Sequence, residues 1–156
     1  MQTFSRRAAL ALIVAGLAGC GRRERAGATR STSGLHTNET PELRRLIDRY
    51  SAEYQVPAGL VHRVVQRESG YRPEARNGPY YGLMQILPQT ARTMGYHGSA
   101  QGLLNAETNL KYGVKYLRGA WLLSNGSHDR AVMWYAKGYY YEAKRRGMLV
   151  ETGLRA

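Results

Sequence analysis

The stretch LVHRVVQRES, residues 60–69, decides the fold of this 156-residue chain. Its apolar residues stand at positions 60, 61, 64 and 65, the spacings that bring side chains to one face of an α-helix. Glu68 follows at helical spacing and shares that face. We therefore expect a helix that opens at Pro57, packs its apolar face against a core and ends on a carboxylate.

The same helical periodicity dominates the sequence from residue 41 onward. Thr40 and Pro41 fit an N-cap followed by proline at the first helical position. Further helices are expected from Pro88 to near Gly95, from Ala106 to just before Asn125-Gly126, from His128 or Asp129 through Tyr135, and from Tyr140 to Arg146. No segment alternates convincingly as a β-strand, so the predicted class is all-α with about six helices.

Glu68 is the one carboxylate whose placement suggests chemistry. Apolar surroundings disfavour an ionised carboxyl, and the last turn of a helix is electronegative, so both should raise its pKa. A carboxyl with a raised pKa can hold a proton near neutral pH and donate it to a leaving oxygen. The alternative is a solvated Glu68, or one paired with a nearby arginine (Arg63, Arg67 or Arg72).

The remaining acids do not supply an obvious catalytic partner, although ordinary glycosidases use two carboxylates. Glu74 lies in a Pro/Gly/Asn-rich loop and could serve only if that loop folds back. Glu107 stands at a helix start, where the dipole favours an acid for structural reasons. Asp129, Glu142 and Glu151 lie in polar surroundings typical of solvent-facing positions. If the protein is a glycosidase, the sequence favours one carboxylate that acts first as acid and then as base.

Charge, cysteine and histidine content narrow the possible partners. The formal net charge of +12 attracts polyanions such as nucleic acid, anionic lipid or an acidic cell wall, or else it only makes a soluble basic surface. The basic residues are dispersed, so no nucleic-acid partner is expected. The lone Cys20 excludes an intramolecular disulfide. The four histidines, His36, His62, His97 and His128, show no metal-ligand spacing, so no metal is expected.

Residues 1–19 are typical of an export signal. Arg6-Arg7 precedes an apolar run over residues 8–19, which is shorter than the ~20 residues that span a bilayer. The sequence LAGC at 17–20 resembles a bacterial lipobox, in which Cys20 becomes the acylated first residue. The segment SRRAAL at 5–10 also resembles a twin-arginine signal. An uncleaved, membrane-anchored signal is the alternative.

Residues 20–40 are rich in Arg, Gly, Ser and Thr and are predicted to be an acylated cysteine followed by a flexible tether. The folded domain is then expected over residues 41–156. Gly21 after Cys20 favours sorting to the outer membrane, so we expect an exported periplasmic lipoprotein held in that membrane through Cys20.

Three motifs carry a family resemblance: ESGY at 68–71, GLMQI at 82–86 and NLKYGVKYL at 109–117. In this order and spacing they resemble the catalytic domain of the soluble-lytic-transglycosylase family, which has a lysozyme-like fold, over roughly residues 45–152. The resemblance implies cleavage of the β-1,4 bond between N-acetylmuramic acid and N-acetylglucosamine in peptidoglycan, a 1,6-anhydromuramic product, no cofactor and a monomeric enzyme.

The resemblance also implies roles for single residues. Glu68 matches the single acid/base of the family, and Ser69 the residue that helps orient the reacting sugar. Met84 and Gln85 match residues that line the cleft, and Tyr116 matches a tyrosine behind it. Tyr135 and Gly138 match a late Tyr-Asn-x-Gly motif in which this chain has Ala136 instead of asparagine.

Two other functions stay open at this point. A muramidase would hydrolyse the same bond and would need a usable second carboxylate. A non-catalytic wall-binding lipoprotein would keep the groove while Ala136 has spoiled the chemistry. Tyr80-Tyr81 and Tyr139-Tyr140-Tyr141 could supply faces for sugar stacking, or could simply pack in the core.

Overall fold

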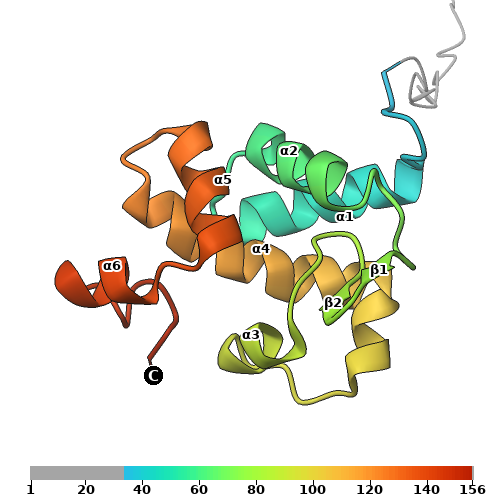
Figure 1. Ribbon diagram of the computed structural model, residues 1–156. Helices are drawn as coiled ribbons and strands as arrows, with labels where there is room; N and C mark the ends of the chain where they lie inside the picture. The colour runs from blue at the N-terminus through green and yellow to red at the C-terminus, as the bar shows by residue number, and fades with distance from the viewer. Residues whose placement is uncertain (1–33, 156) are drawn as a thin grey trace, which may run out of the picture. The chain divides into compact units, whose positions relative to one another are not determined.

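The computed structural model describes residues 34–155 of the chain. The predicted signal, the acylated Cys20 and most of the predicted tether lie outside these residues. Six α-helices are described: α1 (Pro41–Glu53), α2 (Ala58–Glu68), α3 (Pro88–Thr93), α4 (Ala106–Leu123), α5 (His128–Lys137) and α6 (Tyr140–Arg145). The prediction of an all-α class is confirmed, with helix boundaries close to those expected (Figure 1).

Helix α4 runs through the middle of the domain, with α1 and α2 along one side and α5 across its end (Figure 1). Its buried residues, including Leu110, Val114, Leu117 and Leu123, form a stripe that belongs to one hydrophobic cluster with buried residues of α1, α2 and α5. The stripe arises because these apolar residues recur at helical spacing, so burial of one face orders the helices around α4. The main core therefore lies between α4 and the helices that carry Glu68 and Tyr135.

A second, smaller core lies on the other side of α4, beneath α3 and a short hairpin. It contains Tyr81, Ile86, Ala91, Tyr96 and Leu103. Tyr116 of α4 packs against both cores. The boundary between the two cores is where the functional groove described below is found.

The expectation that no strand would form is wrong for one short hairpin. Strands β1 (Arg76–Asn77) and β2 (Tyr80–Tyr81) pair antiparallel, with Arg76 opposite Tyr81 and Asn77 opposite Tyr80. Strands of two residues are too short to show alternation in a sequence. The Gly78-Pro79 dipeptide between the paired Asn77 and Tyr80 is the signal that could have found them, because Gly78 adopts φ +56 at the first turn position. A 3-10 helix, η1 (Ala100–Leu104), was also not expected.

The end of the predicted tether packs on the domain. Residues 34–40 precede α1, and the Thr40 side chain accepts a hydrogen bond from the Leu43 amide as the expected N-cap. Glu39 is buried, with its side chain fully inaccessible, because it pairs with Arg44 of α1. The polar composition of residues 34–40 did not predict this packing, because the residue that anchors the segment is the charged Glu39 and not an apolar side chain.

Candidate active site

The end of α2 places Glu68 at the surface of the main core. Val61, Val64 and Val65 are buried on the same face, and the Glu68 side chain is 24% exposed. The helix ends because Ser69 leaves the helical conformation, and Gly70 and Tyr71 follow in the left-handed region at φ +58 and +61. Glu68 is thus half-buried at a sharp change of chain direction.

Burial raises the pKa of Glu68, and the positive charge of Arg67 offsets part of that rise. The contact with Arg67 is long, with 3.6 Å between its Nε and Glu68 Oε1, and the Arg67 side chain is largely exposed. Arg63 instead pairs with Asp129 at 2.6 Å, and Arg72 donates from Nε to the Ser69 carbonyl at 2.8 Å. Of the three arginines near Glu68 in sequence, only Arg67 contacts it, and weakly, so the effect of burial on the Glu68 pKa prevails.

The GLMQI turn is held beside Glu68 by Asn109 of α4. This side chain is fully buried; its Oδ1 accepts from the Met84 amide at 2.8 Å, and its Nδ2 donates to the carbonyls of Tyr81 and Leu103. Three backbone groups that would otherwise be orphaned are thereby satisfied. Asn109 belongs to the third sequence motif, but no role was predicted for it. Its place as a polar residue within the apolar stripe of α4 could have indicated a buried structural role.

Gln85 of the GLMQI turn lines the same cavity as Glu68. It adopts φ +46, and its Nε2 donates to the carbonyls of Ala75 and Gly82 at 3.1 and 2.9 Å. Its Oε1 is buried and has no hydrogen-bond partner among residues 34–155. Gln85 therefore links the loop before β1 to the turn after β2 and keeps one acceptor unused.

Tyr135 of α5 closes the site from the opposite side. Its hydroxyl donates to the Met84 carbonyl at 2.8 Å, and its ring meets that of Tyr116 edge-on at 5.4 Å. Burial, to which the nearby Glu68 charge adds, raises the pKa of Tyr135 well above its ordinary value. Burial likewise raises the pKa of Tyr116 to about 12. Both phenols are consequently neutral hydrogen-bond donors at physiological pH.

Two adjoining cavities form one groove along these residues. The first is lined by Arg67, Glu68, Asn77, Tyr80, Gln85, Tyr135 and Ala136. The second is lined by Tyr80, Gln85, Ile86, Leu87, Thr90, Tyr116, Tyr135, Ala136, Lys137 and Gly138. Four residues line both, so the groove runs continuously between the hairpin and α5. It is open to solvent, and Glu68 lines the first of its two cavities.

The structure brings four of the six predicted site residues to this groove and leaves two beneath it. Glu68, Gln85, Tyr116 and Tyr135 line it. The prediction that Met84 lines the cleft is wrong for its side chain, which is fully buried, and a Cβ added at Gly113 would lie 2.6 Å from its sulfur. Ser69 is also buried, and its hydroxyl donates to the Val65 carbonyl at 3.2 Å. Both side chains therefore support the groove from below.

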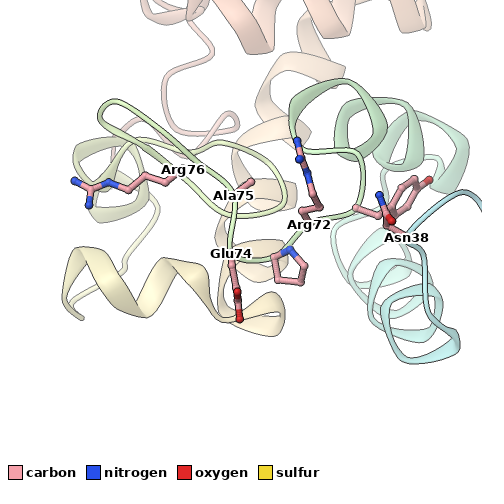
Figure 2. Close-up of a pocket in the computed structure, with 7 residues that line it drawn as sticks. Asn38, Arg72, Glu74, Ala75 and Arg76 are labelled. Atoms are coloured by element: carbon pink, nitrogen blue, oxygen red, sulfur yellow. The ribbon is translucent and has the colours of Figure 1, made fainter.

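No second carboxylate lines the Glu68 cavity in the described part of the chain. Glu74 faces a separate pocket with Asn38, Tyr71 and Arg72, where the charged side chains of Glu74, Arg72 and Arg76 point in different directions (Figure 2). Glu107 accepts hydrogen bonds from Arg49 and Tyr50, and Glu142 is held by Arg145 and Arg146. Glu68 is left as the one carboxylate of its cavity.

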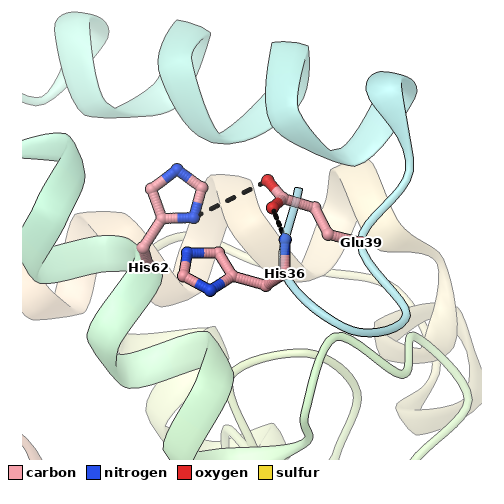
Figure 3. Close-up of side chains that lie close together, drawn as sticks. All are labelled: His36, Glu39 and His62. Carbon is pink, nitrogen blue, oxygen red and sulfur yellow. Dashed lines mark hydrogen bonds and ion pairs between the residues drawn. The ribbon is translucent and has the colours of Figure 1, made fainter. Parts of the chain in front are cut away.

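One group of potential metal ligands lies outside the groove, where α2 meets the segment before α1. The interpretation of the histidines as scattered is wrong for His36 and His62, which the fold brings together with Glu39 (Figure 3). Their ligating atoms lie within 4.8 Å of one another, a donor set that suits zinc. However, the Arg44 guanidinium already donates to both Glu39 oxygens, at 2.5 and 2.7 Å. Because this positive charge occupies the carboxylate, we interpret the cluster as an ion-pair anchor for residues 34–40.

Comparison with known families agrees with this geometry. The family model described as Transglycosylase SLT domain matches residues 45–147, about two thirds of the chain. No solved structure matches the chain significantly. The matched region contains α2, the hairpin, the GLMQI turn, α4 and α5, and therefore every residue of the groove.

Proposed function

Because the chain belongs to the family of transglycosylase SLT domains, which act on peptidoglycan, we propose that it cleaves the MurNAc-β-1,4-GlcNAc bond and leaves 1,6-anhydromuramic ends. Glu68 would act as acid and then as base. The observation that carries this proposal is the half-buried Glu68 that stands as the one carboxylate of its cavity.

The reaction can be written with a single carboxyl group. Protonated Glu68 donates its proton to the glycosidic oxygen as the bond from that oxygen to C1 of the muramic sugar breaks. The C6 hydroxyl of the same sugar then bonds to C1, and its proton passes to the Glu68 carboxylate. No water is consumed, and the proton taken up restores the starting acid. The raised pKa of Glu68 suits the first step.

The muramidase alternative receives less support from the groove. A hydrolase of the same bond ordinarily positions water or an intermediate with a second carboxylate. Within residues 34–155, the nearby Glu74 lines a different pocket from Glu68. An internal hydroxyl as the nucleophile is the simpler fit to this arrangement.

The other groove residues would bind and orient the glycan. Tyr80 is 42% exposed and lines both cavities, so its ring can stack on a sugar. Gln85 lines both cavities, and its bonds to the Ala75 and Gly82 carbonyls would keep that wall of the groove in place. Ala136 lines both cavities without a polar side chain, so the hydrogen bond that asparagine could make at this position is missing.

We propose further that the enzyme is a lipoprotein of the cell envelope. The sequence features that support this are the signal-like residues 1–19 and the lipobox-like LAGC that ends at Cys20. No helix in the described part of the chain has the length and apolarity needed to cross a bilayer. Acylation at Cys20 would provide the attachment, and multiple acyl chains would make it stable.

The test is mass spectrometry of muropeptides released from purified sacculi by the full chain. Wild type and Glu74→Gln, the matched loss of a neighbouring carboxylate, should both release anhydro-muropeptides. Glu68→Gln should reduce that release by about 10²-fold or more, the usual contribution of a general acid–base group. New reducing ends that accumulate with time would show hydrolysis instead. Equal sacculus binding by wild type and Glu68→Gln, with no turnover by either, would show a binding protein.

A further inference from the structure

A segment that precedes the family-matched region contacts the turn at Gly70 and Tyr71, directly after Glu68. Residues 34–39, which we call the strap, pass over the end of α2 before the chain enters α1. They lie outside the matched residues 45–147. The strap therefore adds to the domain something that the family match does not cover.

Two contacts join the strap to the turn after Glu68. The Asn38 side-chain amide donates from Nδ2 to the Gly70 carbonyl at 3.1 Å. The His36 ring stacks on the Tyr71 ring, with centroids 5.1 Å apart and planes 13° apart. Gly70 and Tyr71 stand two and three residues after Glu68, so the strap touches the segment that sets the direction of the α2 end.

The strap is itself firmly anchored. Glu39 is buried and accepts hydrogen bonds from Arg44 and from the backbone amide of His36, the latter at 2.9 Å. Burial alone would raise the pKa of Glu39, but the Arg44 and His36 hydrogen bonds outweigh it and lower the pKa, so the anchor is ionised at neutral pH. Asn38 adopts φ +65, a left-handed conformation that asparagine tolerates well.

The turn after Glu68 needs outside support. Tyr71 is a bulky residue at φ +61, where a side chain is strained, and such a conformation persists only when its surroundings fix it. The Tyr71 hydroxyl meets His62 Nδ1 at 2.8 Å, and the His36 ring covers the Tyr71 ring. The Gly70 carbonyl lies beyond the end of α2 and accepts a hydrogen bond from the Asn38 side chain.

We propose that the strap is a positioning element for Glu68, with Asn38 as the positioning residue that holds the Gly70–Tyr71 turn. This inference rests on the proposed function of Glu68 as the acid/base. Asn38 lines the pocket on the far side of the loop and is absent from the lining of the Glu68 cavity, so it acts through the turn and does not touch the glycan site.

The experiment compares full-length Asn38→Gly and Asn38→Asp with wild type. Glycine keeps the left-handed backbone and removes the amide, whereas aspartate keeps the shape and replaces the donor with an acceptor. The matched control is Asn105→Ala, which removes one exposed asparagine hydrogen bond, at the N-cap of α4, away from the strap. Each variant is assayed for kcat and KM on sacculi, and the Glu68 carboxyl is titrated by ¹³C NMR.

We expect both Asn38 variants to lower kcat about fivefold to tenfold with KM nearly unchanged, the effect of losing one hydrogen bond that acts on the reacting group. Asn38→Gly should also move the Glu68 titration toward that of an ordinary exposed glutamate, because a looser turn admits water. Asn105→Ala should leave both quantities at wild-type values. Wild-type kcat and an unmoved titration in both Asn38 variants would overturn the proposal.

The NMR titration separates this inference from the proposed function. If Glu68→Gln keeps full activity, the assignment of the acid/base fails, yet the Glu68 titration in Asn38→Gly still reports whether the strap holds the turn. If Glu68→Gln is inactive and the Asn38 variants behave as wild type in both measurements, the strap proposal alone fails.

Discussion

Glu68 places a partly buried carboxylate in a groove that is open to solvent. The helical spacing of its apolar neighbours predicted the face on which it lies, because periodicity determines the side of a helix. Sequence alone could not decide between a free carboxyl and one bridged to arginine. That depended on Arg63 pairing with Asp129, which is far away in sequence, and on Arg72 donating to the nearby Ser69 carbonyl instead of to Glu68.

The raised pKa of Glu68 predicts a pH-dependent cost in stability. A carboxyl whose folded pKa exceeds its unfolded value contributes stability that is fully present below the unfolded pKa and is lost as pH rises through the folded pKa. Glu68→Gln does not titrate, so its Tm minus the wild-type Tm should grow as pH rises from the ordinary glutamate pKa of about 4.3 through the raised pKa of Glu68.

Differential scanning calorimetry of both proteins across that pH range checks this expectation. Glu74→Gln removes an exposed carboxyl outside the groove and serves as the control for loss of one negative charge. A Tm difference between Glu68→Gln and wild type that shrinks as pH rises would contradict the assigned direction of the Glu68 pKa.

At the scale of elements, the hairpin and the GLMQI turn show what helical periodicity leaves out. The positions of α1, α2, α4 and α5 were predictable because each buries apolar residues at helical spacing, whereas the short α3 and α6 bury one alanine each. The hairpin depends on a two-residue turn, and the GLMQI turn depends on a single buried asparagine on α4. The hairpin is too short for a periodic signal, and the Asn109 contact joins residues 25 positions apart, so neither shows in the helical pattern.

Two glycines of this region should respond very differently to alanine. Gly82 adopts φ +72, and an added Cβ would overlap the Asn109 amide and the Leu103 carbonyl, so Gly82→Ala should break the Asn109 network. We expect a loss of about 3 kcal/mol or more, since several buried hydrogen bonds would be disturbed. Gly78 has φ +56 but open space around it, so Gly78→Ala should cost only about 1 kcal/mol of backbone strain.

Urea unfolding of the two variants and wild type gives both free energies of unfolding. The comparison isolates packing from conformation, because both glycines lie in the left-handed region and only Gly82 is crowded. Equal losses in the two variants would mean that conformation alone determines the requirement for glycine at position 82.

At the scale of the whole molecule, the strong positive charge and the proposed export signal favour the same environment, the cell envelope. A net charge of +12 favours an anionic surface, and Cys20 is the single cysteine available for acylation. The family match establishes the class of enzyme over residues 45–147, and the sequence before it carries the proposed attachment.

Cys20→Ala in the full chain tests that attachment. We expect wild type to sediment with membranes and to incorporate labelled palmitate, whereas Cys20→Ala should carry no label and remain largely in the soluble fraction. Anhydro-muropeptide release by the purified variant should match wild type on isolated sacculi, because Cys20 lies outside the matched domain. Identical fractionation and labelling of both proteins would contradict acylation at this residue.

The strap also bears on how this domain is studied in isolation. A fragment cloned from residue 45 onward, the start of the family match, would contain Glu68 and the whole groove yet lack Asn38 and Glu39. It would also leave His62 and Tyr71 without the His36 ring beside them. Kinetic constants measured on such a fragment would describe an enzyme whose acid is less well held, and they would understate the activity of the intact chain.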